Sequence, residues 1–308
     1  MNTKISMRDS FWNRIYDLAK KDKNIMLVDG DMGAPSLDKF RKDLNGQYFS
    51  VGIAEHNMIA IASGLAKEGK KVFTYAIAPF ITSRCHEFTK LNCGLMKIPI
   101  KLVGVGAGFS YDDSGPTHHT TEDITIMRAI PNLEIYSPSD SSMASELAEN
   151  ICKSDKPVYI RLDREIHPNL SQEGENFEKG FRELKEGENV AIIATGNLVH
   201  KALEVHDYLI NKGIKVGVID LYKLKPLPQQ LNMTLAKYKK IISIEEHILD
   251  GGFGSIIAET IVDNDLDVKL KRIGLKSYIY AYGGRENIRK SCGIDIDSII
   301  KKVSEFIN

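Results

Sequence analysis

The sequence predicts an α/β protein of two doubly wound domains, each with a mostly parallel sheet covered by helices. Short continuous apolar runs, such as residues 25–28 and 158–162, have the composition of strands buried on both faces. Segments with helical periodicity alternate with these runs, beginning with residues 6–22. The alternation stops between Glu165 and Asn189, where the chain becomes polar, and then resumes. This interruption predicts a linker between two domains.

Length and composition narrow the class of protein. The 308 residues suffice for two domains, and Lys+Arg balances Asp+Glu at 41 each, so no overall charge favours nucleic acid or an anionic membrane. No apolar run approaches the ~20 residues of a membrane helix, and the N-terminus lacks the apolar core of a signal peptide. The four cysteines form no CxxC pair. We therefore expect a cytoplasmic protein with reduced thiols and no zinc site.

The first domain is expected to span residues 1–165. Its helix over residues 6–22 carries Phe11 and Trp12 on one stripe, and the following strand ends in the polar turn Asp29-Gly30-Asp31. Open α/β sheets place ligands at this end of their strands. Further strands are expected near Phe49 and at 72–75, 101–105, 133–136 and 158–162. Further helices are expected to start at Glu55 and to span residues 79–96, 122–129 and 141–153. Asp140 is expected to cap the last of these helices.

A linker over residues 166–189 and a second, smaller domain over residues 190–308 follow. Pro168, Gly174, Gly180 and Gly187 interrupt the linker. The second domain is expected to contain strands at 190–194, 215–219 and 241–244 and helices at 198–212, up to Leu235, at 255–262 and at 294–307.

Glycines 104, 106 and 108 follow an expected strand and suggest a dinucleotide fingerprint. That fingerprint requires a helix to open at once, so that its N-terminus can hold a pyrophosphate. Here residues 109–116 are polar, aromatic and end in Gly-Pro, which is incompatible with such a helix. We therefore interpret the glycines as positions of close backbone approach.

Two polar stretches are candidate functional sites. Glu55 lies between a strand-like run and an apolar helix that Gly69 can end, so it is either a first-turn stabiliser of the helix dipole or a functional carboxylate. The second stretch, residues 115–123, carries His118 and His119 after a rigid Gly-Pro turn. Adjacent histidines point in different directions and are poor joint metal ligands. One imidazole could instead enter a cleft as a hydrogen-bond donor or proton carrier, or both could be surface residues.

These stretches resemble the transketolase family of thiamine-diphosphate enzymes. The motif at residues 52–58, centred on Glu55, and the Gly-Pro-Thr-His loop at 115–118 look like its pyrimidine-binding domain, and residues 127–132 and 157–161 agree. Ala-Thr-Gly at 194–196, Lys-Pro at 225–226 and Glu-Glu-His with its glycine turn at 245–255 are similar to its carboxyl-terminal domain. The resemblance covers nearly the whole chain, as in a split transketolase subunit.

The resemblance implies thiamine diphosphate as the cofactor and assigns roles to individual residues. Glu55 would hold a pyrimidine nitrogen and favour the tautomer that deprotonates the thiazolium carbon intramolecularly; such a carboxyl should lie in an apolar pocket. Phe80 would stack on the pyrimidine, and Ile77 stands where a second aromatic is usual; whether Tyr75 replaces it is open. Asp31 matches a flanking cofactor-binding position, and His118 the histidine facing substrate hydroxyls.

The resemblance also implies a partner chain. The family binds the diphosphate through Mg²⁺ in an amino-terminal domain with a Gly-Asp-Gly motif, which the turn at Asp29 does not reproduce. We expect a second subunit to supply that domain and its metal, with no metal site on this chain. Because the family's coenzyme lies between subunits, two copies of this chain with two of the partner are expected.

Three departures from the family bear on the substrate. Ser137 replaces a phosphate-binding arginine, Gly106 an early loop histidine and Ser114 an aspartate before the Gly-Pro-Thr-His loop. We therefore hypothesise ketol transfer on a modified, nucleotide-linked or otherwise atypical sugar. The alternatives are the β subunit of a 2-oxoacid dehydrogenase, against which the loop argues, a deoxyxylulose-phosphate synthase, and a non-catalytic interaction subunit.

Overall fold

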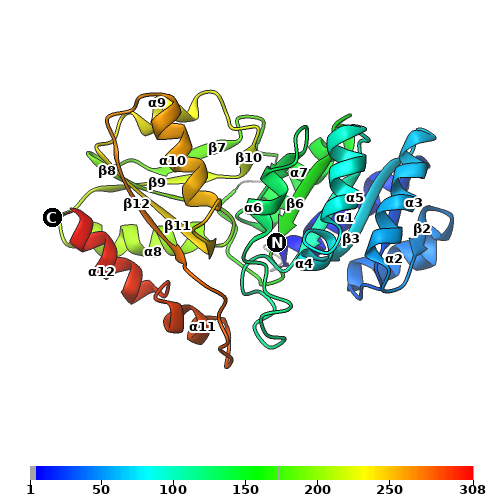
Figure 1. Ribbon diagram of the computed structural model, residues 1–308, viewed down its shortest axis with the longest axis horizontal. Helices are drawn as coiled ribbons and strands as arrows, with labels where there is room; N and C mark the ends of the chain where they lie inside the picture. The colour runs from blue at the N-terminus through cyan, green and yellow to red at the C-terminus, as the bar shows by residue number, and fades with distance from the viewer. Residues whose placement is uncertain (1–4, 172–173, 308) are drawn as a thin grey trace. The chain divides into compact units, whose positions relative to one another are not determined.

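The computed structural model describes residues 5–171 and 174–307, which form two compact units (Figure 1). Unit 1 is the described chain up to Ala107 together with Ile126–Phe177. Unit 2 is Gly108–Thr125 together with the described chain from Glu178. Each unit contains a mostly parallel sheet flanked by helices, so the predicted fold class is confirmed.

The strands of unit 1 lie side by side in the order β5-β6-β4-β3-β1-β2, and all their pairings are parallel. Every residue of β1, β4 and β6 is buried. Helices on both faces exclude water from these strands, which is why their sequences are continuously apolar. The strands are β1 (Ile25–Asp29), β2 (Tyr48–Ser50), β3 (Lys71–Ile77), β4 (Lys101–Val105), β5 (Glu134–Tyr136) and β6 (Val158–Leu162).

Two long helices of unit 1, α1 and α7, pack against each other. Ser6 caps α1 and accepts the Asp9 N–H, and Asp140 caps α7 and accepts the Met143 N–H at 2.7 Å, as its sequence predicts. The helices are α1 (Met7–Ala19), α2 (Pro35–Asp43), η1 (Asn45–Gln47), α3 (Glu55–Lys67), α4 (Ala78–Ile81), α5 (His86–Thr89), η2 (Lys90–Leu95) and α7 (Ser141–Lys153); α6 (Asp123–Arg128) crosses from unit 2 into unit 1.

The core of unit 1 is aromatic where α1 meets the sheet. Trp12 is fully buried and packs edge-on against Phe11, Phe40 and Tyr75. Such edge-to-face pairs contribute about 0.5–1.5 kcal/mol beyond the area that they bury. This packing fixes β3, which leads directly into the segment carrying Phe80.

Unit 2 has the strand order β12-β11-β8-β9-β7, in which only β7 is antiparallel to its neighbour among the described pairings. No described helix in either unit is long and apolar enough to cross a membrane. The elements of unit 2 are β7 (Phe181–Lys185), β8 (Val190–Ala194), α8 (Leu198–Ile210), β9 (Val216–Leu221), β10 (Lys223–Lys225), α9 (Leu231–Leu235), β11 (Lys240–Ile248), α10 (Phe253–Asp263), β12 (Lys269–Leu275), α11 (Arg285–Cys292) and α12 (Ile296–Ile307).

The prediction of a single helix over residues 79–96 is wrong. The chain instead forms α4, α5 and the π-helical η2, with a break around Thr82. Thr82 donates its hydroxyl to the Ala78 carbonyl at 2.6 Å, a local hydrogen bond that competes with regular helix geometry. Arg84 lies within this break, between α4 and α5.

The linker predicted over residues 166–189 contains one strand, β7, that the sequence pattern did not predict. This edge strand buries Phe181 but exposes Lys185, so its sequence lacks the apolar run of the central strands. The sequence pattern also failed to predict five other described elements that are short, polar or at a sheet edge: α2, η1, β10, β12 and α11.

Candidate active site

Glu55 is the first residue of α3 and is nearly inaccessible, with 2% of its surface exposed. The preceding residue, Ala54, makes no side-chain cap, so the carboxylate is the negative charge of the first turn. The strand before it ends next to Gly52, whose φ of +67° suits glycine and turns the chain into the helix. Met58 and Ile59 lie buried on the same helix and anchor it. The sequence thus places a buried carboxylate at the carboxyl side of β2.

Arg84 is the partner of Glu55, and sequence reasoning did not single it out for this role. Its Nη1 donates to Glu55 Oε2 at 2.7 Å, while its side chain stays 38% exposed against 3% for the carboxylate. The same guanidinium lies over the Phe80 ring, with Cζ 4.2 Å from the ring centroid. One flat cation therefore spans the carboxylate and the aromatic face. The Glu55 carboxylate, expected in an apolar pocket, thus has a partly exposed cation as its partner.

Phe80 and Ile77 lie where β3 ends and α4 begins. Both are half-buried, so each keeps part of its surface accessible. Tyr75, two residues earlier, is fully buried with its ring 4.9 Å from that of Trp12. Tyr75 is therefore a core residue, and its burial argues against its replacing the missing aromatic.

The turn after β1 approaches Glu55 through a glycine. A Cβ on Gly30 would lie 3.3 Å from Glu55 Cγ, so a larger residue there would press on the carboxylate. Asp29 is fully buried and accepts the Tyr48 hydroxyl at 2.6 Å. Asp31, the predicted cofactor-binding residue, is exposed, has φ +63° and donates its N–H to Asp29 Oδ1 at 3.2 Å. The buried member of the pair is thus Asp29.

His118 and His119 belong to unit 2, whereas Glu55, Phe80, Ile77 and Asp31 belong to unit 1. His118 is half-buried, and its Nδ1 lies 3.0 Å from the Thr117 hydroxyl. His119 is 4% exposed and packs edge-on against Phe109, with ring centroids 5.0 Å apart. Burial lowers the pKa of His119 below its usual 6.5, so this ring is neutral at pH 7. The adjacent histidines thus occupy different environments.

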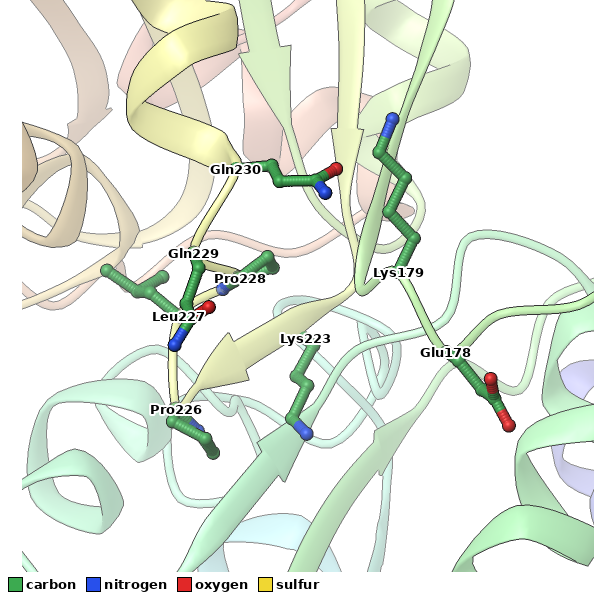
Figure 2. Close-up of a pocket in the computed structure, with 8 residues that line it drawn as sticks. All are labelled: Glu178, Lys179, Lys223, Pro226, Leu227, Pro228, Gln229 and Gln230. Atoms are coloured by element: carbon green, nitrogen blue, oxygen red, sulfur yellow. The ribbon is translucent and has the colours of Figure 1, made fainter.

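The remaining polar features lie apart from these residues in the sequence. A pocket of about 530 Å³ in unit 2 lies around the Lys225-Pro226 turn, and Figure 2 shows Lys223, Gln229 and Gln230 among its lining side chains. In unit 1, ligand atoms of Asp163, Glu165 and His167 lie within 4.8 Å of one another. Carboxylate clusters of this kind are common without an ion, so they assign no metal role. That this chain supplies no metal site stays a prediction.

The reduced state of the thiols stays a prediction, and most of the cysteines lie in buried surroundings. All four cysteines are free, and Cys85, Cys93 and Cys152 are buried. Burial raises the pKa of Cys85 and of Cys93 to about 12, which keeps both thiols protonated and unreactive.

Comparison with known proteins identifies the family. Residues 3–168 match the model of the transketolase pyrimidine-binding domain, and residues 180–299 match that of the transketolase C-terminal domain. One subunit of the apulose-4-phosphate transketolase of Phocaeicola vulgatus is 32% identical over 99% of this chain and 99% of its own length. The SqwH subunit of the 6-deoxy-6-sulfo-D-fructose transketolase of a Clostridium species is 32% identical over 97% of this chain and 94% of its own.

A solved structure supports the same assignment. A chain described as a split gene transketolase, in an inactive beta4 tetramer, superposes with a TM-score of 0.87 at 27% identity, covering 98% of each chain. The fold and both domain models agree. The chain therefore belongs to the transketolase family of thiamine-diphosphate-dependent enzymes and corresponds to its carboxyl-terminal half, as found in split subunits.

Proposed function

We propose that this chain is the coenzyme-activating subunit of a transketolase-like enzyme that transfers a two-carbon ketol unit between sugars. The observation that carries the proposal is the pair formed by buried Glu55 and Phe80, which one planar N–H donor already bridges. The guanidinium of Arg84 stands in for the aminopyrimidine, which is also flat, carries N–H donors and stacks on aromatic rings. The residues present therefore fit the coenzyme.

When bound, thiamine diphosphate would supply a nucleophilic thiazolium carbon for chemistry at the donor carbonyl. Glu55 holds the proton shared with the pyrimidine, and its burial strengthens that hydrogen bond by excluding water. Phe80 would stack on the pyrimidine ring, Ile77 would line the same site, and Asp31, in the turn after β1, would bind the cofactor. His118 hydrogen-bonds substrate hydroxyls through its partly accessible imidazole.

A partner chain completes the enzyme in this proposal. It carries the diphosphate-binding domain and the Mg²⁺ site, and two copies of each chain form a heterotetramer. The names of the relatives, which are subunits of transketolases, support a divided enzyme. The spans of the two family models, 3–168 and 180–299, support the division into two domains proposed at 1–165 and 190–308, although the second match begins inside the proposed linker 166–189. We place the protein in the cytoplasm.

The substrate class follows from the departures at Gly106, Ser114 and Ser137. Loss of an arginine removes bidentate recognition of a phosphate, so the preferred sugar differs from ordinary pentose phosphates. The names of two relatives include an apulose phosphate and a sulfonated deoxyfructose, which supports an atypical sugar as donor or acceptor. Nucleotide-linked sugars fall in the same class.

The decisive experiment reconstitutes the chain with its partner, thiamine diphosphate and Mg²⁺. Glu55→Gln should lower turnover by about 100-fold or more, because it removes a proton-transfer group. The matched control is Glu134→Gln, at another buried glutamate of unit 1, which should retain turnover. Full activity of Glu55→Gln would refute the role of Glu55.

Substrate panels complete the test. Donors should include xylulose 5-phosphate, apulose 4-phosphate, 6-deoxy-6-sulfofructose and pyruvate, each with ribose 5-phosphate and glyceraldehyde 3-phosphate as acceptors. Efficient turnover of xylulose 5-phosphate with ribose 5-phosphate would refute the atypical sugar. Turnover of pyruvate alone would favour the synthase alternative.

A further inference from the structure

Unit 2 contains a buried ion cluster centred on Glu246, at the end of β11. The Glu246 side chain is 4% exposed, and the side chains of Arg285 and Arg289 on α11 are 3% and 5% exposed. Arg285 Nη2 lies 2.5 Å from Glu246 Oε2, and Arg289 Nε lies 2.6 Å from Oε1. Arg289 also pairs with the exposed Glu286. Both carboxylate oxygens are thus engaged by guanidinium groups.

The cluster holds its carboxylate in the charged form. Burial alone would raise the pKa of Glu246, but the two arginines and the Phe109 N–H outweigh it and lower the pKa to about 2. With one glutamate and two arginines the buried centre carries a net charge of about +1, before the exposed Glu286 is counted. Removing the carboxylate would leave two buried cations without their shared partner.

One end of the loop Gly108–Thr125 is fastened to this cluster. The Phe109 N–H donates to Glu246 Oε2 at 2.9 Å, and the Arg285 N–H donates to Asp112 Oδ2 at 2.8 Å. Gly108 has φ +61°, and a Cβ on it would lie only 2.0 Å from Glu246 Oε2. The glycine is therefore required for the backbone to reach the carboxylate.

The other end of the same loop is fastened to the residues that follow Glu246. The Ile124 N–H donates to His247 Nε2 at 3.2 Å, and the Ile248 N–H donates to the Thr121 carbonyl at 2.8 Å. A backbone bridge between Gly108 and Thr120 closes the loop at its base. His118 lies between the two fastened ends.

We propose that Glu246, together with Arg285 and Arg289, positions the loop Gly108–Thr125 and thereby His118 for the substrate. The sequence of this loop lies in the pyrimidine-domain match, but its contacts place it in unit 2. The C-terminal domain therefore acts on the reaction by holding the substrate-facing loop. This inference rests on the proposed function for the role of His118, although the fastening of the loop can be measured without it.

A charged anchor suits this role better than apolar packing. Hydrogen bonds to an ionised carboxylate are stronger and more directional than those between neutral groups, so they fix the backbone at Phe109 as well as the side chains. An apolar cluster would bury area without setting the register of the loop. The alternative is that Glu246 only stabilises unit 2, and the experiment separates the two roles.

The test uses hydrogen–deuterium exchange on the reconstituted complex of both chains with thiamine diphosphate and Mg²⁺. Glu246→Gln should accelerate exchange of the peptides covering 108–125 by about 10-fold or more, because local opening no longer breaks a charge-assisted anchor. Gly108→Ala serves as a second variant that keeps all three charges of the ion cluster but forces the backbone of the loop and the Glu246 carboxylate apart, so it should also accelerate exchange of 108–125. The double variant Glu246→Gln/Arg289→Gln restores the net charge and should recover part of the protection.

The matched control is Asp220→Asn, which breaks another buried ion pair of unit 2, between Asp220 of β9 and Arg182 of β7. It should leave exchange of 108–125 within about twofold of wild type. If Glu246→Gln and Gly108→Ala both leave the loop protected, or if Asp220→Asn frees it equally, the positioning role is refuted.

Kinetics then connect the loop to the substrate. With the best donor and acceptor from the substrate panel, Glu246→Gln should raise KM or lower kcat by about 10-fold while the affinity for thiamine diphosphate stays within about twofold. A loop that opens without any kinetic effect would overturn the link to His118. Loss of activity in Glu134→Gln, or full activity in Glu55→Gln, would instead indicate failure of the proposed function, so the two failures are distinguishable.

Discussion

Replacing Arg84 by methionine should tighten the binding of thiamine diphosphate. Arg84 occupies both positions proposed for the pyrimidine, the Glu55 carboxylate and the Phe80 ring, so the guanidinium has to leave before the coenzyme enters. Methionine keeps an unbranched chain and part of the apolar contact but cannot donate to Glu55. The competing interaction would therefore disappear from the free protein.

The magnitude follows from the exposure of the two partners. A hydrogen bond to a charged group contributes about 1.5–3 kcal/mol, but Arg84 is 38% exposed and exposed pairs contribute at most about 1 kcal/mol. The contact of the cation with Phe80 adds about 0.5–1 kcal/mol at such a site. Together these interactions oppose the coenzyme by about 1–2 kcal/mol, which corresponds to an affinity about 5- to 30-fold tighter in the variant.

Isothermal titration of the reconstituted complex with thiamine diphosphate at saturating Mg²⁺ measures this change. Arg14→Met is the matched control, because Arg14 is 37% exposed and pairs with Glu149 elsewhere in unit 1. Its coenzyme affinity should equal that of wild type. If Arg84→Met bound the coenzyme more weakly, Arg84 would hold Glu55 in place for the coenzyme, and the competition argument would be refuted.

Two further predictions concern stability. Asp140→Ala should lower the free energy of unfolding of this chain by about 3 kcal/mol in urea titrations, because the buried carboxylate caps α7 and also accepts the N–H groups of Leu170 and Ser171. As a control, substitution of the exposed Asp17 by alanine should change the free energy of unfolding by less than about 0.5 kcal/mol. Lowering the pKa of Glu246 from its ordinary 4.5 to about 2 stabilises the folded state above pH 4.5 by about 3 kcal/mol, and this stability is lost as the pH falls from 4.5 towards 2. Acid unfolding followed by circular dichroism should therefore be flatter over that range in Glu246→Gln, and an unchanged slope would contradict the charged state of the cluster.

The sequence by itself determined the fold class, most central strands and the buried glutamate. Strands such as β1, β4 and β8 are buried on both faces, so their apolar runs are readable without any knowledge of neighbours. The Asp140 cap and the start of α3 at Glu55 are local features, set by residues within one turn of the chain. The family motifs around Glu55 and in the Gly-Pro-Thr-His loop are likewise continuous in sequence.

Only the tertiary structure decided which distant groups meet. Arg84 reaches Glu55 across 29 positions because the helix expected there breaks at Thr82, a local competition that periodicity cannot show. Glu246 contacts Phe109 across 137 positions, and α11, which brings Arg285 and Arg289, is too short and polar to be read from hydrophobic pattern. Buried charges are tolerated only where partners compensate them, and here the partners of Glu246 come from an element distant in sequence. Periodicity carries no information about such convergence, so the ion cluster and the attachment of the loop to unit 2 had to come from the folded chain.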